Sequence, residues 1–175
     1  MIIDLGVARN IDAQSFGQPG ERTFRLRLLG YAAESASLWL EKEHVQAMSL
    51  ALQQVISRLG HEEPPRVAEL GDFPDVPDYD LRVGRMSVGF DLSDRTAVLE
   101  VEELGSEPEK GSGLRVRLTR GQCASLVVQL DRIIAAGRPT CPLCSLPIDP
   151  QGHVCPRSNG HSGQAVPDGS GGDEQ

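Results

Sequence analysis

Three of the four cysteines lie close together near the C-terminal end of the chain, and their spacing is typical of a metal site. Cys141 and Cys144 form a Cys-x-x-Cys pair, and His153 and Cys155 form a His-x-Cys pair a few residues later. Zinc takes four nitrogen or sulfur ligands in a tetrahedron, and two such pairs supply them. We therefore expect Cys141, Cys144, His153 and Cys155 to bind Zn²⁺.

There are alternatives both for the fourth zinc ligand and for the role of the three clustered thiols. His161 could replace His153, although it lies in sequence that resembles a tail. A thioredoxin-like dithiol opens a helix after a strand, whereas Cys141 begins a Pro-rich loop after a predicted helix. A disulfide between two of the three clustered cysteines would leave the third thiol unpaired. The remaining cysteine, Cys123, lies on an apolar helical stripe and is expected in the core.

The same pattern argues for a structural ion and against catalysis. A catalytic zinc keeps one coordination position open, whereas four protein ligands close the site. The zinc deaminase pattern of His-x-Glu before Pro-Cys-x-x-Cys is absent, as is a Gly-x-Ser-x-Gly nucleophile elbow. The sequence predicts no catalytic residue. A segment as short as 138–160 cannot bury enough apolar surface to fold without such an ion.

The elements before the cysteines follow two hydrophobic periods. Phe24-Arg-Leu-Arg-Leu28 and Leu114-Arg-Val-Arg-Leu118 alternate apolar and charged residues, which predicts half-buried strands. Apolar residues at helical spacing follow each region, and Gly60 and Gly137 are placed to end the two helices.

Apolar positions recur with an offset of 78 residues, which predicts tandem β-β-β-α half-repeats over about 11–60 and 81–137. We expect an α+β fold in which the halves share one antiparallel sheet with two helices on one face. The seven positions are Leu38, Leu40, Val45, Met48, Leu52, Val55 and Ile56, and their counterparts are Val116, Leu118, Cys123, Leu126, Leu130, Ile133 and Ile134.

A second candidate site follows from the strand alternation, because the residues between the apolar ones must face outward. Arginine binds phosphates and carboxylates through its forked guanidinium, and Trp stacks on bases or cations. The face could bind an anionic ligand or an acidic partner. The alternative is a solvated face of cross-strand Arg–Glu pairs that use Glu41, Glu100 and Glu102. The residues of this predicted face are Arg25, Arg27, Trp39, Arg115 and Arg117.

The charge is unevenly distributed along the chain. Its distribution indicates where the domains end and limits the classes of possible partner. The chain has 175 residues with 17 Lys and Arg, 25 Asp and Glu, and a net charge of −8. Residues 62–80 carry one basic and seven acidic side chains, so we interpret 61–80 as an acidic linker that could cover the arginine face. The acidic balance argues against duplex nucleic acid. No apolar run approaches the roughly 20 residues of a membrane span.

These boundaries give an α+β domain over 1–137, a zinc knuckle over 138–160 and a disordered tail over 161–175. The Gly- and Ser-rich composition of the tail is typical of a flexible linker.

Several segments of the chain occur together in one order. They are Phe16-Gly-Gln-Pro-Gly-Glu-Arg-Thr-Phe24, Leu38-Trp-Leu-Glu-Lys42, Arg82-Val-Gly-Arg-Met86, Leu114-Arg-Val-Arg-Leu-Thr119, Ala136-Gly-Arg-Pro-Thr-Cys-Pro-Leu-Cys144, Gly152-His-Val-Cys-Pro-Arg157 and Asn159-Gly160. Together these segments resemble a family catalogued as domain of unknown function 3090, which is widespread in actinobacteria.

The resemblance covers about residues 4–160 and implies a cytoplasmic protein, commonly encoded near a histidine-phosphatase-like and a lipid-kinase-like protein. It implies no reaction. Ser145 stands where the family usually has Gly, and residue 161 is often aromatic there, which disfavours His161 as a ligand.

The sequence thus favours a zinc-stabilised interaction or regulatory protein with a protein partner, rather than an enzyme. An enzyme or enzyme subunit that binds a phosphorylated or carboxylated small molecule at the arginine face is the second hypothesis. A single-stranded nucleic-acid binder that uses Trp39 is the third, and the seven aromatic residues of the chain speak against it. The sequence gives no oligomeric state.

Overall fold

The fold is that of a computed structural model, which describes residues 1–60, 71–106, 111–148 and 152–157. The chain divides into two compact units, Met1–Gly137 and Arg138–Gln175. Half of the predicted acidic linker (61–70), the alternative ligand His161 and the whole predicted tail lie outside the described residues.

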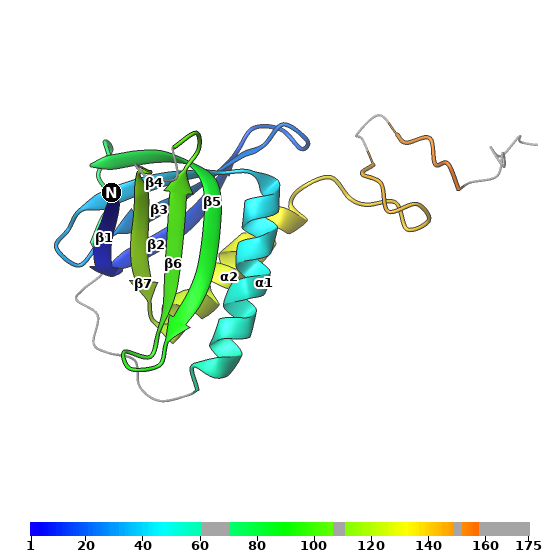
Figure 1. The fold of residues 1–175 in the computed structure, drawn as a ribbon. Coiled ribbons are helices and arrows are strands. Elements are labelled where there is room, and N and C mark those ends of the chain that lie inside the picture. Colours follow the sequence, from blue (N-terminus) through cyan, green and yellow to red (C-terminus); the bar gives the residue numbers. More distant parts are fainter. Residues whose placement is uncertain (61–70, 107–110, 149–151, 158–175) are drawn as a thin grey trace, which may run out of the picture. The chain divides into compact units, whose positions relative to one another are not determined.

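The first unit is a seven-stranded sheet with two helices. Seven strands lie in the order β1-β7-β6-β5-β4-β3-β2. Figure 1 shows α1 and α2 side by side, and both pack on the sheet. The elements are β1 (Ile2–Val7), β2 (Asn10–Phe16), β3 (Thr23–Leu29), β4 (Ser35–Leu40), α1 (Lys42–Arg58), β5 (Tyr79–Asp91), β6 (Thr96–Glu103), β7 (Gly113–Leu118) and α2 (Arg120–Ala135).

The α+β class is confirmed, but the prediction of an antiparallel sheet is wrong, because the sheet is mixed. β4 pairs with β5 in parallel, and β1 pairs with β7 in parallel. The parallel β4–β5 pair follows from α1, a crossover helix that carries the chain back to the end of the sheet at which β4 begins. β1 was not expected, since its sequence lacks a clear alternation.

β5 joins the two halves of the sheet through a bulge. Its first residues pair with β4, and from Val83 onward it pairs with β6, with a register shift between Val83 and Arg85. Gly84 lies at this shift. A Cβ atom there would come within 2.8 Å of the Cα of Leu104, so the close approach of the two backbones requires glycine.

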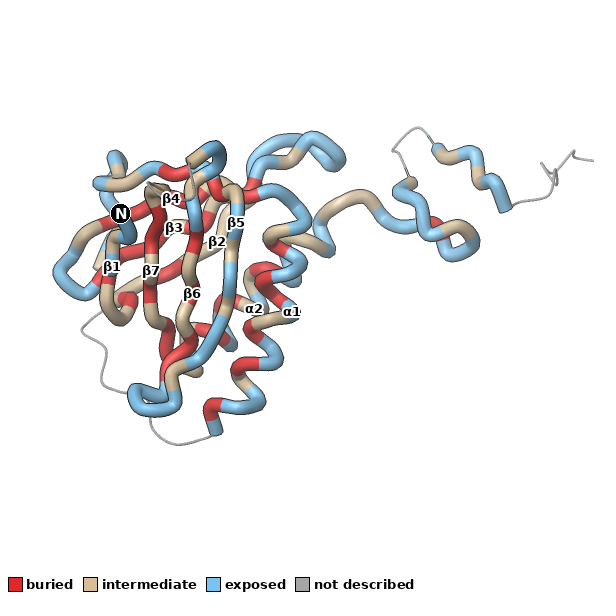
Figure 2. The backbone as a smooth tube through the Cα atoms, viewed as in Figure 1, coloured by how far each residue is buried: buried red, intermediate tan, exposed pale blue. Residues whose placement is uncertain are grey.

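The core lies between the sheet and the helices, as the alternation predicts. On β3, Leu26 and Leu28 are fully buried, and on β7 so are Leu114 and Leu118. Figure 2 shows the buried positions recurring along the strands and along the sheet-facing sides of both helices. The helical residues of this core cluster are Val45, Met48, Leu52, Val55, Leu59, Cys123, Leu126 and Leu130.

The helix ends agree with the sequence signals. Thr119 caps α2, because its side chain accepts the N–H of Gln122 while the Gln122 side chain accepts the N–H of Thr119. After β1, the order of elements is three strands, a helix, three strands and a helix. That order fits two half-repeats, whose common origin stays a prediction. In the described residues, neither helix has the length and apolar character of a membrane span.

Candidate metal centre

A short turn presents the first two cysteines. The N–H of Cys141 donates to the carbonyl of Leu146 at 2.8 Å, and the N–H of Ser145 donates to the carbonyl of Cys141 at 2.8 Å. Thr140 and Pro147 form an antiparallel bridge at the base of this turn. The chain therefore doubles back over residues 140–147 and holds Cys141 and Cys144 on the inside of the turn.

The turn also prepares Cys141 as a ligand. The backbone N–H groups of Cys144 and Leu143 donate to its sulfur and lower its pKa to about 6. Partial burial raises the pKa of Cys144. Cys141 is therefore a thiolate at neutral pH, which is the form that binds metals. Metal binding would supply the positive charge that Cys144 needs to lose its proton.

The second pair closes the site from the other side. The Sγ atoms of Cys141 and Cys155 lie 3.7 Å apart, and Cys144 Sγ lies 3.1 Å from His153 Nε2. Between the two ligands of this pair, Val154 is 95% exposed, so His153 and Cys155 face inward together as alternate residues of an extended chain do.

The spacing fits a tetrahedral zinc. The four ligand atoms lie within 4.8 Å of one another. Zn–S bonds of about 2.3 Å and Zn–N bonds of about 2.0 Å place tetrahedral sulfurs about 3.8 Å apart and a sulfur and nitrogen about 3.5 Å apart. The 3.7 Å between Cys141 and Cys155 matches the first value closely, and the 3.1 Å between Cys144 Sγ and His153 Nε2 is shorter than the second, so these two side chains would move apart slightly around an ion. The donor set and its spacing therefore fit a metal ion without a change of fold.

The fourth cysteine has a different environment. Cys123 is 0% exposed on α2, and burial raises its pKa to about 12. It is a core thiol, as the helical stripe predicts, and does not contribute to the cluster of ligands.

Ser145 is the residue of this turn whose backbone is strained. Its φ is +61°, a left-handed conformation that costs a residue with a Cβ about 1–2 kcal/mol relative to glycine. We expect Ser145→Gly to relieve this cost and to tighten zinc binding about 5- to 30-fold, because metal binding and the folding of such a turn are coupled. Competition with a chelator of known affinity measures the change. Equal affinities of the two proteins would contradict it.

In the structure, the arginine side chains of the predicted face contact neighbouring residues. Arg25 donates to Gln14 at 2.6 and 3.1 Å and lies over the rings of Phe16 and Trp39, 5.0 and 5.4 Å from their centres. Arg27 pairs with Asp12, and this hydrogen bond raises its pKa.

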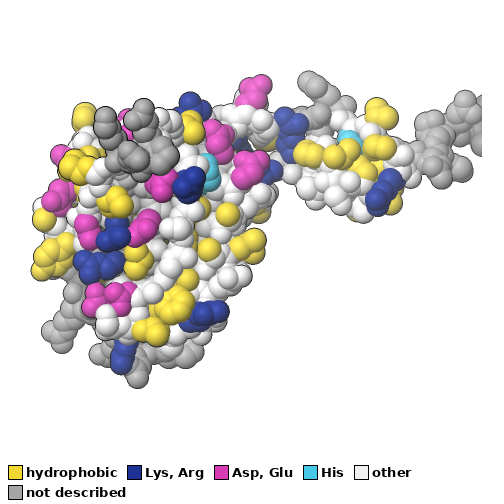
Figure 3. All heavy atoms as spheres, viewed as in Figure 1, with side chains coloured by type: hydrophobic (Ala, Val, Ile, Leu, Met, Phe, Trp, Pro, Cys, Tyr) yellow, Lys and Arg dark blue, Asp and Glu magenta, His cyan; other side chains and the backbone are white. Residues whose placement is uncertain are grey.

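The arginines of the other half are paired in the same way. Arg115 contacts Glu100 at 2.6 Å, and Arg117 contacts Asp94 at 3.0 Å. On the face of the first unit shown in Figure 3, basic side chains lie among acidic ones. These are the pairs expected of a solvated face. The partners Gln14, Asp12 and Asp94 were not identified from the sequence, because strand register decides them.

Part of the predicted linker lies on this face. The Phe73 ring lies 4.3 Å from the Arg27 guanidinium, and the Gly71 carbonyl accepts a hydrogen bond from the Asn10 side chain at 2.9 Å. The predicted linker therefore meets the predicted arginine face through an aromatic residue at Arg27, and through an acid at Trp39, whose Nε1–H donates to Asp80 at 2.6 Å.

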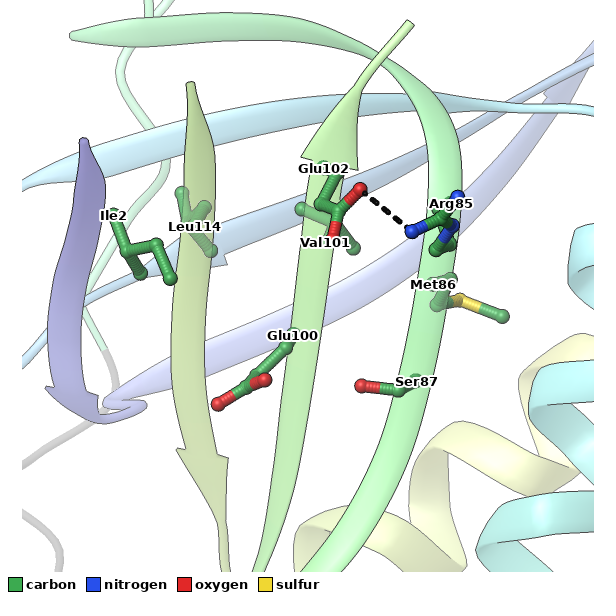
Figure 4. Close-up of a pocket in the computed structure, with 8 residues that line it drawn as sticks. All are labelled: Ile2, Arg85, Met86, Ser87, Glu100, Val101, Glu102 and Leu114. Atoms are coloured by element: carbon green, nitrogen blue, oxygen red, sulfur yellow. Dashed lines mark ion pairs between the residues drawn. The ribbon is translucent and has the colours of Figure 1, made fainter. Parts of the chain in front are cut away.

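A shallow pocket occurs on β1, β5, β6 and β7 (Figure 4). Its volume of about 70 Å³ is far below the roughly 300 Å³ at which ligand sites begin. Arg85 and Glu102 form an ion pair at its rim, 3.5 Å apart. Because Glu100 and Glu102 line this pocket, it is poorly suited to an anionic ligand. The lining residues are Ile2, Arg85, Met86, Ser87, Glu100, Val101, Glu102 and Leu114.

The comparisons with known proteins give a family but no activity. No curated protein matches the chain significantly. One family model, described as "Protein of unknown function (DUF3090)", matches residues 5–155. The match spans both the mixed sheet and the four clustered ligands. The chain therefore belongs to this family of proteins of unknown function, DUF3090.

Proposed function

We propose that Cys141, Cys144, His153 and Cys155 bind one Zn²⁺ and that the protein is a zinc-stabilised interaction or regulatory protein. The observation that carries the proposal is the convergence of four ligand atoms within 4.8 Å. Three thiolates and an imidazole suit zinc, whereas magnesium and calcium prefer oxygen ligands. With all four positions taken by the protein, the ion is structural and offers no open position to a substrate.

The surface of the knuckle supports an interaction role. Leu143, Leu146 and Val154 are 56%, 48% and 95% exposed on a segment of very few residues. Its described residues include Arg138 and Arg157 but no Asp or Glu. Exposed aliphatic side chains among basic ones suit a protein partner with an apolar, acidic surface. The described part of the knuckle has no aromatic residue on which a nucleobase could stack.

Metal analysis tests the zinc directly. Protein purified without chelators should contain one equivalent of zinc per chain, and the Cys144→Ser variant should contain far less. A wild-type content below about half an equivalent, which does not rise after zinc is added to reduced protein, would contradict the proposal. Cys123→Ser serves as the matched control, since this thiol lies in the core.

A hollow beside Trp39 favours a second candidate function. Its volume is about 330 Å³, within the range of small-ligand sites, and its lining includes Trp39, Glu41 and Arg82. Arg82 and Glu41 are exposed and only 3.4 Å apart, so an anionic ligand could replace Glu41 at little cost. An enzyme or enzyme subunit that binds a phosphorylated or carboxylated small molecule would use this hollow.

Surface variants separate the two functions. We expect Val154→Ser to reduce capture of a protein partner at least tenfold while the fold is kept, because Val154 is 95% exposed. Trp39→Ala and Arg117→Glu should leave capture unchanged if the knuckle is the contact. The measurement is affinity capture from cell extract, with the captured protein then quantified against purified variants. Loss of capture in Trp39→Ala alone would instead place the contact on the sheet.

A further inference from the structure

We propose that Cys141 and Cys155 form an oxidation site, at which a hydroperoxide closes a disulfide and releases the zinc. This inference rests on the proposed zinc site and assigns it a regulation. It makes the fold of the knuckle depend on the redox state of its surroundings.

The geometry selects this pair of thiols. The two Sγ atoms lie 3.7 Å apart, and a disulfide needs about 2.05 Å, so a small movement of the two side chains closes the bond. Cys144 Sγ interacts with both of these sulfurs too, but it lies 3.1 Å from His153 Nε2. Cys155 follows Cys141 by 14 positions, and this length of chain leaves the backbone free to adopt disulfide geometry.

The two sulfurs differ in access, and this gives them different roles. Cys155 is half-buried, whereas Cys141 is 6% exposed. Of the two thiols of this pair, an oxidant therefore meets Cys155 first, and Cys141 attacks from inside the turn; Cys144 is exposed to a similar degree as Cys155. Cys123 is 0% exposed and is protected by the core, so it provides an internal reference thiol.

The chemistry balances with a hydroperoxide as the oxidant. The Cys155 thiolate attacks the O–O bond and becomes a sulfenic acid, while the leaving oxygen takes up a proton as water or alcohol. The Cys141 thiolate then attacks the Cys155 sulfur, the S–S bond forms, and the sulfenic oxygen leaves with a proton as water. Two thiolates and one peroxide with two protons give one disulfide and two molecules of water, when the peroxide is H₂O₂.

Zinc release follows from the ligand count. A disulfide sulfur is neutral and a poor ligand, so oxidation leaves Cys144 and His153 as the remaining two of the four ligands. A structural zinc needs four. The new disulfide still joins Cys141 to the second pair, but Cys144 and His153 lose the ion that held them together, so the arrangement of the exposed Leu143, Leu146 and Val154 changes.

The experiment uses the full-length zinc-loaded protein, with its zinc content measured first. Samples are treated with H₂O₂ at increasing ratios. Released zinc is followed with a colorimetric chelator, and thiols are identified by alkylation and peptide mass spectrometry. We expect one zinc released per disulfide, a Cys141–Cys155 linked peptide, alkylated Cys144 and Cys123, and recovery of zinc binding after reduction and zinc addition.

The outcomes distinguish this inference from the proposed function. Protein that holds no zinc before oxidation refutes the zinc site itself. Protein that holds one zinc but keeps it when glutathione in the same tube is fully oxidised refutes the switch. A disulfide between Cys141 and Cys144, or irreversible sulfonic acid, also refutes it. Cys155→Ser should give no linked peptide with Cys141, whereas Cys144→Ser should still form the Cys141–Cys155 bond.

Discussion

Replacing Cys141 with Ser is expected to abolish zinc binding and to unfold the knuckle, while the α+β unit keeps its stability. The change removes one of four ligands and the thiolate that accepts the N–H groups of Leu143 and Cys144. Zinc binding by such small segments supplies apparent free energies of about 10–16 kcal/mol, and this energy folds them. We expect an affinity loss of at least about 100-fold, which corresponds to about 2.7 kcal/mol.

Hydrogen exchange gives the most direct measurement. Amides of Cys141, Ser145 and Ile148 donate to backbone carbonyls within the knuckle and should be protected in the zinc form. In Cys141→Ser they should exchange as in a free peptide, and chelation of the wild type should have the same effect. The melting temperature of the α+β unit should change by less than about 2 °C, because the two units are separate compact bodies.

The Cys123→Ser variant is expected to give the opposite result, with a less stable α+β unit and unchanged zinc binding. It places a hydroxyl at a fully buried position of α2, which costs about 1–3 kcal/mol if the hydroxyl finds no partner. This variant should melt earlier and keep one zinc. If Cys141→Ser lowered the stability of the α+β unit as much as Cys123→Ser does, the zinc would be part of the main core and the two units would not be separate.

The sequence predicts best what neighbouring residues determine. Alternation placed β3 and β7, helical spacing placed α1 and α2, and Gly60 and Gly137 marked the ends of the two helices. The cluster of candidate metal ligands was predictable for the same reason, since their spacing along the chain is itself the signal. Each of these features depends on residues close together in the sequence, with the candidate ligands spanning 14 positions from Cys141 to Cys155.

Contacts between distant segments were not predictable in the same way. β1 pairs with β7 more than 100 residues later, and nothing in Ile2–Val7 marks that partner. The arginine face illustrates the same limit. The alternation predicted that Arg25 and Arg27 point outward. Their contacts with Gln14 and Asp12 depend instead on the register of β2 on β3. Register depends on the whole sheet and its turns.

Gly84→Val is expected to destabilise the α+β unit by about 3 kcal/mol or more, since the bulge joins the two halves of the sheet at this residue. The added Cβ would lie 2.8 Å from the Cα and 3.2 Å from the N of Leu104, and backbone atoms cannot move aside as a flexible side chain can. The N–H of Leu104 donates to the carbonyl of Arg82 at 2.7 Å, so any shift also weakens this bond. Forced overpacking typically costs about 1–3 kcal/mol, and backbone displacement adds to it.

Gly89 on the same strand is the matched control. A Cβ there meets nothing within 4 Å, so Gly89→Val adds a β-branched side chain to an open position. It should be neutral or stabilise the unit by up to about 1 kcal/mol, because Val favours strands more than Gly does. Urea unfolding of the two variants measures both effects, and Gly84→Ala gives a milder change if Gly84→Val does not fold. Equal midpoints for the variants at 84 and 89 would show that β5 does not need the close approach at Leu104, and that the halves are joined in another way.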